Sequence, residues 1–166
     1  MIHNTHFSQF IPPTLFHPVT GTFTWTAGAV AGTIAMARAA ANETSVITIP
    51  IMIPSNSVAL QGAKLTSIEV DYENAVAECT SFTWTLNKVT RGINGAVAVV
   101  AAVTKTDAIA AADSHAVDEV KQVITLTTPE WVDNDVYYLL QISIVAGAGG
   151  GTNKFYAAVA NFTLRA

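Results

Sequence analysis

Strict alternation of apolar and polar side chains is the feature that most limits what this chain can fold into. The clearest stretch covers residues 80–89, with the sequence TSFTWTLNKV. Phe82, Trp84 and Leu86 fall on one face of it, and the threonines between them fall on the other. Neighbouring side chains of a β-strand point to opposite faces, so this pattern predicts a strand with one buried face.

Similar runs recur along the chain and predict eight or nine strands. In chain order they are 22–26 with a return at 33–37, 45–53, 64–72, 80–89, 96–104, 120–128, 136–145 and 155–164. Half-apolar strands need a second layer, and two packed antiparallel sheets supply it most simply. We therefore predict an all-β, two-sheet antiparallel β-sandwich, with an eight-stranded jelly roll favoured by the strand count. An immunoglobulin-like sandwich is the alternative, although its pair of cysteines is missing.

Details of the strand prediction can be checked against a structure. The aromatic pair Phe23 and Trp25 is expected to point into the core, as Phe82 and Trp84 do. The strand 136–145 is the most apolar and should be central. Pro50 indicates an edge position or a bulge, because proline cannot donate a ladder hydrogen bond. Residues 105–118 are expected to form a helix or a loop, and 93–95, 133–135 and 147–151 are expected to form turns or loops.

The first twenty residues differ from the rest of the chain. They hold three prolines and three of the four histidines, and no acidic side chain, lysine or arginine. Proline excludes a long helix and a central strand. We predict an extended N-terminal arm over residues 1–20, followed by a single β-sandwich domain over 21–166. The apolar side chains expected to dock this arm on a neighbouring subunit or on its own sandwich are Phe7, Phe10, Ile11, Leu15 and Phe16.

Charge is scarce, at 12% of residues against 51% hydrophobic ones. A soluble domain usually carries about a quarter charged residues. The shortfall indicates that part of the surface is covered by other copies or by a larger assembly. A homo-oligomer with a structural or binding role therefore fits better than an enzyme.

Several classes of partner and location are not expected. The eight lysines and arginines form no basic run, which argues against nucleic acid as a partner. No apolar stretch reaches the ~20 residues of a spanning helix, and no classical signal peptide is visible, so a soluble protein without a membrane partner is expected. The single cysteine, Cys79, excludes an internal disulfide and a cysteine-based zinc site, and a buried thiol is expected there.

The search for reactive groups leads us to expect no catalytic residue, no cofactor and no metal. Asp113, Ser114 and His115 are adjacent in sequence, whereas a catalytic triad is assembled by the fold from distant residues. His3 and His6 lack a third ligand, and the 133–135 segment lacks the rest of a calcium loop. The glycine-rich 147–151 segment is not followed by the Lys-Ser/Thr of a phosphate loop.

The carboxylates of Glu69, Asp71 and Glu73 share one strand face, which is typical of a solvated sheet surface. Trp131 lies in a predicted turn and is the candidate platform for a ligand. A glycan-binding module that presents Trp131 beside the loops 133–135 and 147–151 is therefore the alternative from another functional class.

The order of segments resembles small jelly-roll structural proteins of tailed bacteriophages, which include capsid decoration and other auxiliary virion proteins. The segments that carry the resemblance are an arm, a Thr/Trp strand, KLTSIEVDY at 64–72, FTWTLNK at 82–88, LTTPEWVDNDVYYLL at 126–140 and NFTLR at 161–165. The resemblance covers about residues 20–166 and is one of style, without an invariant motif. It implies self-association, with trimers favoured, docking on a capsid or similar particle lattice, and location in the virion. A self-assembling filament subunit remains compatible with the same features.

Overall fold

The fold is described from a computed structural model that covers the chain in nine stretches. The described residues are 4–28, 30–39, 42–53, 62–75, 77–92, 98–110, 113–132, 135–146 and 151–165. They form twelve strands and one short 3₁₀ helix. The turn predicted at 93–95 lies outside the described residues, as does most of the segments 133–135 and 147–151. No helix long and apolar enough to cross a membrane occurs within these stretches.

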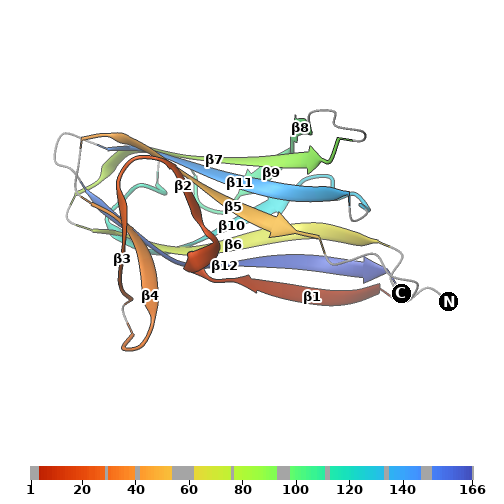
Figure 1. Ribbon diagram of the computed structural model, residues 1–166, viewed down its shortest axis with the longest axis horizontal. Helices are drawn as coiled ribbons and strands as arrows, with labels where there is room; N and C mark the ends of the chain where they lie inside the picture. The colour runs from red at the N-terminus through yellow and green to blue at the C-terminus, as the bar shows by residue number, and fades with distance from the viewer. Residues whose placement is uncertain are drawn as a thin grey trace.

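The strands build two antiparallel sheets that pack face to face (Figure 1). The larger sheet has the order β3-β4-β12-β6-β10-β9, and β1 also pairs with β12. Its strands are β1 (Asn4–Ile11), β3 (Phe23–Ala27), β4 (Ile34–Arg38), β6 (Ala63–Ala75), β9 (Lys105–Asp107), β10 (Asp118–Leu126) and β12 (Thr152–Arg165). The smaller sheet has the order β2-β5-β11-β7-β8. Its strands are β2 (His17–Thr20), β5 (Thr44–Met52), β7 (Cys79–Thr90), β8 (Val99–Ala102) and β11 (Val136–Ala146).

The pairing is that of a jelly roll, as the strand count predicted. Strand β4 pairs with β12, β5 with β11, β6 with β10 and β7 with β8, all antiparallel. These pairs are nested, so the chain from β4 to β12 behaves as one long hairpin that is rolled into two layers. Strand β11 lies between β5 and β7, which confirms its predicted central position.

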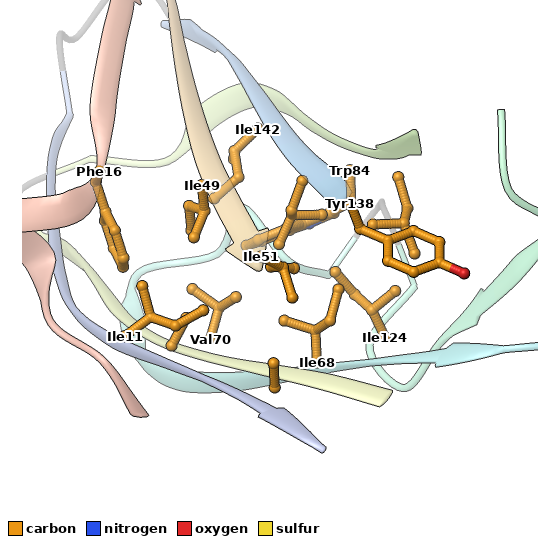
Figure 2. Packing of buried hydrophobic residues seen from close by; sticks show 14 of the residues in the cluster. Ile11, Phe16, Ile49, Ile51, Ile68, Val70, Trp84, Ile124, Tyr138 and Ile142 are labelled. Atoms are coloured by element: carbon orange, nitrogen blue, oxygen red, sulfur yellow. The ribbon is translucent and has the colours of Figure 1, made fainter. Parts of the chain in front are cut away.

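The inward faces of both sheets form one hydrophobic core (Figure 2). Residues Phe82, Trp84 and Leu86 of β7 are buried, and so are Ile68 and Val70 of β6, as the alternation predicted. The rings of Tyr72 and Phe155 from the larger sheet lie against Phe82, with ring centroids 5.4 and 6.4 Å away. Cys79 is buried at the margin of this core, as expected.

The arm residues 4–20 contribute strands to both sheets of the same chain. Strand β1 lies along β12 in register from Asn4 opposite Arg165 to Ile11 opposite Ala158. The 3₁₀ helix η1 (Pro13–Leu15) then turns the chain into β2, which pairs with β5. Gly21 follows with φ +87°, and its Cα lies so near Ser45 that a Cβ would meet the Ser45 hydroxyl at 2.3 Å. Glycine is thus required where the chain crosses from β2 to β3.

One local expectation needs correction and two are refined. Trp25 is exposed, so the prediction that it points into the core was wrong. For residues 105–118 the loop alternative holds over most of the described part, which contains turns and no helix, while β9 and the first residue of β10 are strand. Pro50 pairs with Leu139 of β11, whereas β2 reaches only to Thr48. Pro50 therefore lies where β5 has lost its second neighbour, which explains how a proline fits within this strand.

Candidate functional site

The most distinctive surface is formed by residues 4–37. Arg38 is the first acidic residue, lysine or arginine of the chain, so these residues carry no permanent charge. Among the described residues, seven of the twelve large apolar side chains that are exposed lie in this first quarter of the chain. They are Phe7, Phe10, Leu15, Val19, Trp25, Val30 and Ile34. We call this set the apolar edge.

The fold brings the parts of the apolar edge to one side of the sandwich. Strand β6 occupies one side of β12 from Thr152 to Leu164. On the other side of β12, β4 pairs over Asn153–Phe155 and β1 continues over 158–165. The helix η1 lies against both β4 and β12. The β3–β4 hairpin, η1 and β1 therefore follow one another along the same margin, at the bottom of the view in Figure 1.

The structure divides the five predicted docking residues into two groups. Ile11 and Phe16 are buried and belong to the hydrophobic core of their own chain, because the inward face of β1 and the end of η1 complete that core. Phe7, Phe10 and Leu15 are exposed and remain candidates for docking. Phe10 is the most open of the three, with 64% of its surface accessible, whereas the ring of Phe7 lies 6.4 Å from that of Phe162.

A pocket of about 190 Å³ opens in the apolar edge between β2 and the β3–β4 hairpin. It is lined by Pro18, Phe23, Thr24, Trp25 and Met36. Trp25 and Met36 face each other in register, so the hydrophobic face of the hairpin continues into the pocket. Apolar cavities of about 150 Å³ can accept a benzene ring. The volume and the mainly apolar lining of the pocket would suit an aromatic side chain of a neighbouring molecule.

The outer face of β6, β10 and β12 is the opposite of the apolar edge, because it is charged. Lys121 Nζ lies 3.1 Å from Glu69 Oε2, and Lys154 Nζ lies 3.0 Å from Glu73 Oε2. The Tyr156 hydroxyl donates a hydrogen bond to Glu73, which lowers the pKa of this carboxyl, and Lys154 lowers it further. Hydrogen bonds from Lys121 and Asn161 likewise lower the pKa of Glu69.

Glu69 and Glu73 on this charged face are not suited to act as general acids at neutral pH. A hollow of about 310 Å³ lies on it, lined in part by Asp71, Glu119 and Lys121. A general acid at neutral pH needs a carboxyl whose pKa is raised, whereas the shifts of Glu69 and Glu73 are downward. No group of three or more potential metal ligands occurs among the described residues. His6 lies on β1 and His17 on β2, and His3 lies outside the described residues.

The Asp113–His115 segment anchors a turn to the larger sheet. Ser114 is buried, and its main-chain carbonyl accepts hydrogen bonds from the Tyr72 hydroxyl at 2.7 Å and from Asn74 Nδ2 at 3.0 Å. Asp113 is exposed at the surface. These contacts fasten the turn before β10 to the end of β6.

The candidate platform Trp131 is partly exposed, but Lys64 covers one face of its ring. Lys64 Nζ lies 5.1 Å from the centre of the ring, in the position of a cation–π contact. A sugar stacked on this face would have to displace the lysine. Most of the loops predicted to flank Trp131 lie outside the described residues, so the glycan-binding alternative stays a prediction.

The sequence interpretation located the arm but missed the hairpin half of the apolar edge, including Trp25, Val30 and Ile34. The signal that could have found it is the length of the charge-free run. This run continues past the arm, through both strands of the hairpin, and ends only at Arg38.

No protein-family model matches the sequence, and no curated protein matches it. Among solved structures, the chain is similar to an arabinose-bound α-L-arabinofuranosidase, MgGH51, with a TM-score of 0.43 and 10% identity. The match covers 89% of this chain and 23% of that chain. A likeness this low carries no argument about function.

Proposed function

We propose that this chain is a non-enzymatic structural protein that self-associates and docks on a larger assembly through its apolar edge. The observation that carries the proposal is the coincidence of two properties in residues 4–37. This region has no acidic residue, lysine or arginine, and it exposes most of the large apolar side chains on the described surface. Interface cores are depleted of charge and enriched in aromatic residues in the same way.

The energetic argument rests on several side chains acting together. Burying one side chain of this size contributes about 1.5–3 kcal/mol. Association costs about 4–15 kcal/mol in lost freedom of motion, so no single residue suffices. Phe10, Leu15 and Trp25 lie along one margin, and the pocket beside Trp25 offers a place for an aromatic side chain of a neighbour such as Phe10. Contacts of this kind make or break no covalent bond.

The larger assembly that we propose is a viral capsid, with this chain as a decoration or auxiliary virion protein. The support is the resemblance of segments 64–72, 82–88, 126–140 and 161–165 to small jelly-roll proteins of tailed bacteriophages. That resemblance favours a trimer. The same surface could also join copies head to tail without closure, which would produce a filament.

The test is the mass of the purified chain in solution, measured by light scattering. Deleting the arm would remove Ile11 and Phe16 from the core, so substitutions are the cleaner change. The apolar-edge variant carries Phe10→Ser, Leu15→Ser and Trp25→Ser. The matched control carries Met52→Ser and Val117→Ser, which are equally exposed apolar positions outside this edge.

We expect the wild type and the control to form the same oligomer, and the apolar-edge variant to fall to a smaller species with unchanged circular dichroism. A trimer or closed ring would favour a shell component, and filaments in electron micrographs would favour a fibre subunit. A wild type that is monomeric at all concentrations would overturn the proposal.

A further inference from the structure

Strand β8 is an apolar strand at an open edge of the smaller sheet. It pairs on one side with β7, and within the described stretches no strand lies on its other side. All four of its residues are exposed, with 65% of Val99 and 61% of Val100 accessible. Its side chains alternate between the two faces, so no second layer covers either of them. In Figure 1 it lies at the top margin, far from the apolar edge.

Edge strands usually carry a feature that prevents pairing with another chain, such as a proline, a lysine, a bulge or a covering loop. The opposite edge of the same sheet, β2, contains Pro18 and an irregular register between Pro18 and Thr20. Strand β9 at the edge of the larger sheet carries Lys105 and Asp107, which form an ion pair at 2.6 Å. The sequence AVVAAVT at 98–104 has neither proline nor charge.

The surroundings of β8 are neutral as well. Lys88 lies opposite Ala101 in register, and its Nζ is 2.7 Å from Glu130 Oε1. These two residues line a cleft of about 350 Å³ whose wall is formed by Ala101, Ala102 and Val103. The two charges that line this cleft are therefore paired with each other. A second strand beside β8 would meet neither a free cation nor a free anion from this ion pair.

We propose that β8 pairs antiparallel with β8 of a second copy, across a two-fold axis perpendicular to the sheet. The smaller sheets of the two copies would then form one continuous sheet. This contact rests on the proposed function, because it is a second interface between copies of a chain that self-associates. It differs from the apolar edge in being isologous, which means that the same surface serves both partners.

A second copy is the occupant that the charges favour. Each copy has a formal net charge of −4, so two copies repel each other except where the contact surface is neutral. The 98–104 segment offers such a surface to itself, without requiring a complementary charge. Unpaired main-chain groups of β8 would gain hydrogen bonds in both copies at once.

The geometry makes a prediction that is specific to this axis. A perpendicular two-fold pairs residues of the same parity, so one residue of the segment must lie directly opposite its own copy. Its two Cα atoms would be about 4.5–5.5 Å apart, within the range of a disulfide. The next residue along the strand lies opposite a residue two positions away from its own counterpart in the partner. The Cα atoms of that residue and its counterpart are therefore about 8 Å apart, beyond bridging distance.

The experiment is a single-cysteine scan of residues 98–103 in the full chain under mild oxidation. The native Cys79 is buried, so the wild type is the baseline. We expect disulfide-linked dimers to reach a maximum at one position and to fall toward baseline at its neighbours. Equal yields at all exposed positions would indicate random collision, and dimers at none would exclude the pairing; either outcome overturns the proposal.

A mass measurement separates this contact from the apolar edge. The Val100→Lys variant gives the edge strand a lysine, a feature by which edge strands avoid pairing with another chain, and Val117→Lys is the control at another exposed valine. We expect Val100→Lys to halve the mass of the assembly, and the apolar-edge variant to leave a dimer. If the apolar-edge variant keeps its mass while Val100→Lys halves it, the proposed function of the edge fails and the β8 contact stands. If Val100→Lys keeps its mass, the β8 contact fails whatever the apolar edge does.

Discussion

The sequence Phe-Thr-Trp-Thr occurs twice in this chain, in β3 at 23–26 and in β7 at 82–85, with different outcomes. In β7 both aromatic side chains are buried, and Trp84 keeps only 5% of its surface accessible. In β3, Phe23 packs against the margin of the core, while Trp25 remains 53% accessible. The same four residues thus form a core strand in one place and part of an interaction surface in the other.

The neighbours of each strand explain the difference. Strand β7 lies beside β11, and its inward face meets the rings of Tyr72 and Phe155 from the larger sheet. Within the part of the chain that the structure describes, strand β3 pairs only with β4, which follows β12 for three residues before the hairpin extends beyond the sandwich (Figure 1). Alternation therefore determines which side chains share a face, and the second layer determines whether that face is buried.

The largest effect is expected for Trp84→Ala in the buried copy. Removing this ring leaves a cavity among Tyr72, Phe82 and their neighbours, so the free energy of unfolding should fall by about 3–5 kcal/mol in urea titrations. Trp84 Nε1 has no hydrogen-bond partner among the described residues, so Trp84→Phe should cost less than half as much. The exposed Thr83→Ala is the control. Equal losses for Trp84→Ala and Thr83→Ala would contradict the assignment of Trp84 to the core.

The next effect concerns Arg38, the register partner of Phe23, which fastens the hairpin to the sandwich. Its side chain is fully buried, and it donates hydrogen bonds to Asn153 Oδ1 at 2.7 Å and to the carbonyl of Gly151 at 2.9 Å. Arg38→Met would leave both acceptors buried without this donor. We expect a loss of about 3 kcal/mol.

Faster proteolysis of the hairpin should accompany that loss, because the anchor of β4 on β12 is weakened. The control is Arg91→Met, at an exposed arginine. Unchanged unfolding in Arg38→Met would show that the hairpin is held by its other contacts.

These two residues also show what the sequence could predict. Trp84 was placed correctly because alternation is local and its strand is long. Arg38 gave no such signal, because its burial depends on Asn153 and Gly151, which are more than a hundred residues away in sequence. The jelly-roll class followed from strand number and patterning. The position of the hairpin could not be predicted from strand number and patterning. The hairpin leaves β12 after Phe155 because β1 pairs with the same side of β12 from Ala158 onward.

A smaller effect on stability is expected for the charged outer face of β6, β10 and β12, which contains neither copy of the Phe-Thr-Trp-Thr motif. The pKa of Glu73 is lowered from its usual 4.5, first by the Tyr156 hydroxyl and then by Lys154. Because the folded pKa lies below the unfolded one, this stabilisation is present above about pH 4.5 and is lost as the pH falls through the folded value. Tyr156→Phe should therefore move acid unfolding to higher pH.

The change in the free energy of unfolding at pH 7 should stay below about 1 kcal/mol, since pairs near the surface are screened. Tyr137→Phe, on the other sheet, is the control, and its acid-unfolding midpoint should match that of the wild type. An unshifted midpoint in Tyr156→Phe would show that this hydroxyl does not hold the Glu73 charge.

The smallest effect on stability is expected for Trp25→Ala, in the exposed copy of the motif. Its ring lies outside the core, so the free energy of unfolding should change by less than about 0.5 kcal/mol. The mass in solution should nevertheless fall if the proposed docking function is right, because the ring and its pocket would be lost from the apolar edge. The control is Thr24→Ala at the neighbouring position, which alters the same strand but keeps the Trp25 ring. A loss of several kcal/mol in Trp25→Ala would mean that the hairpin folds back onto the sandwich, and the two copies of the motif would then have the same role.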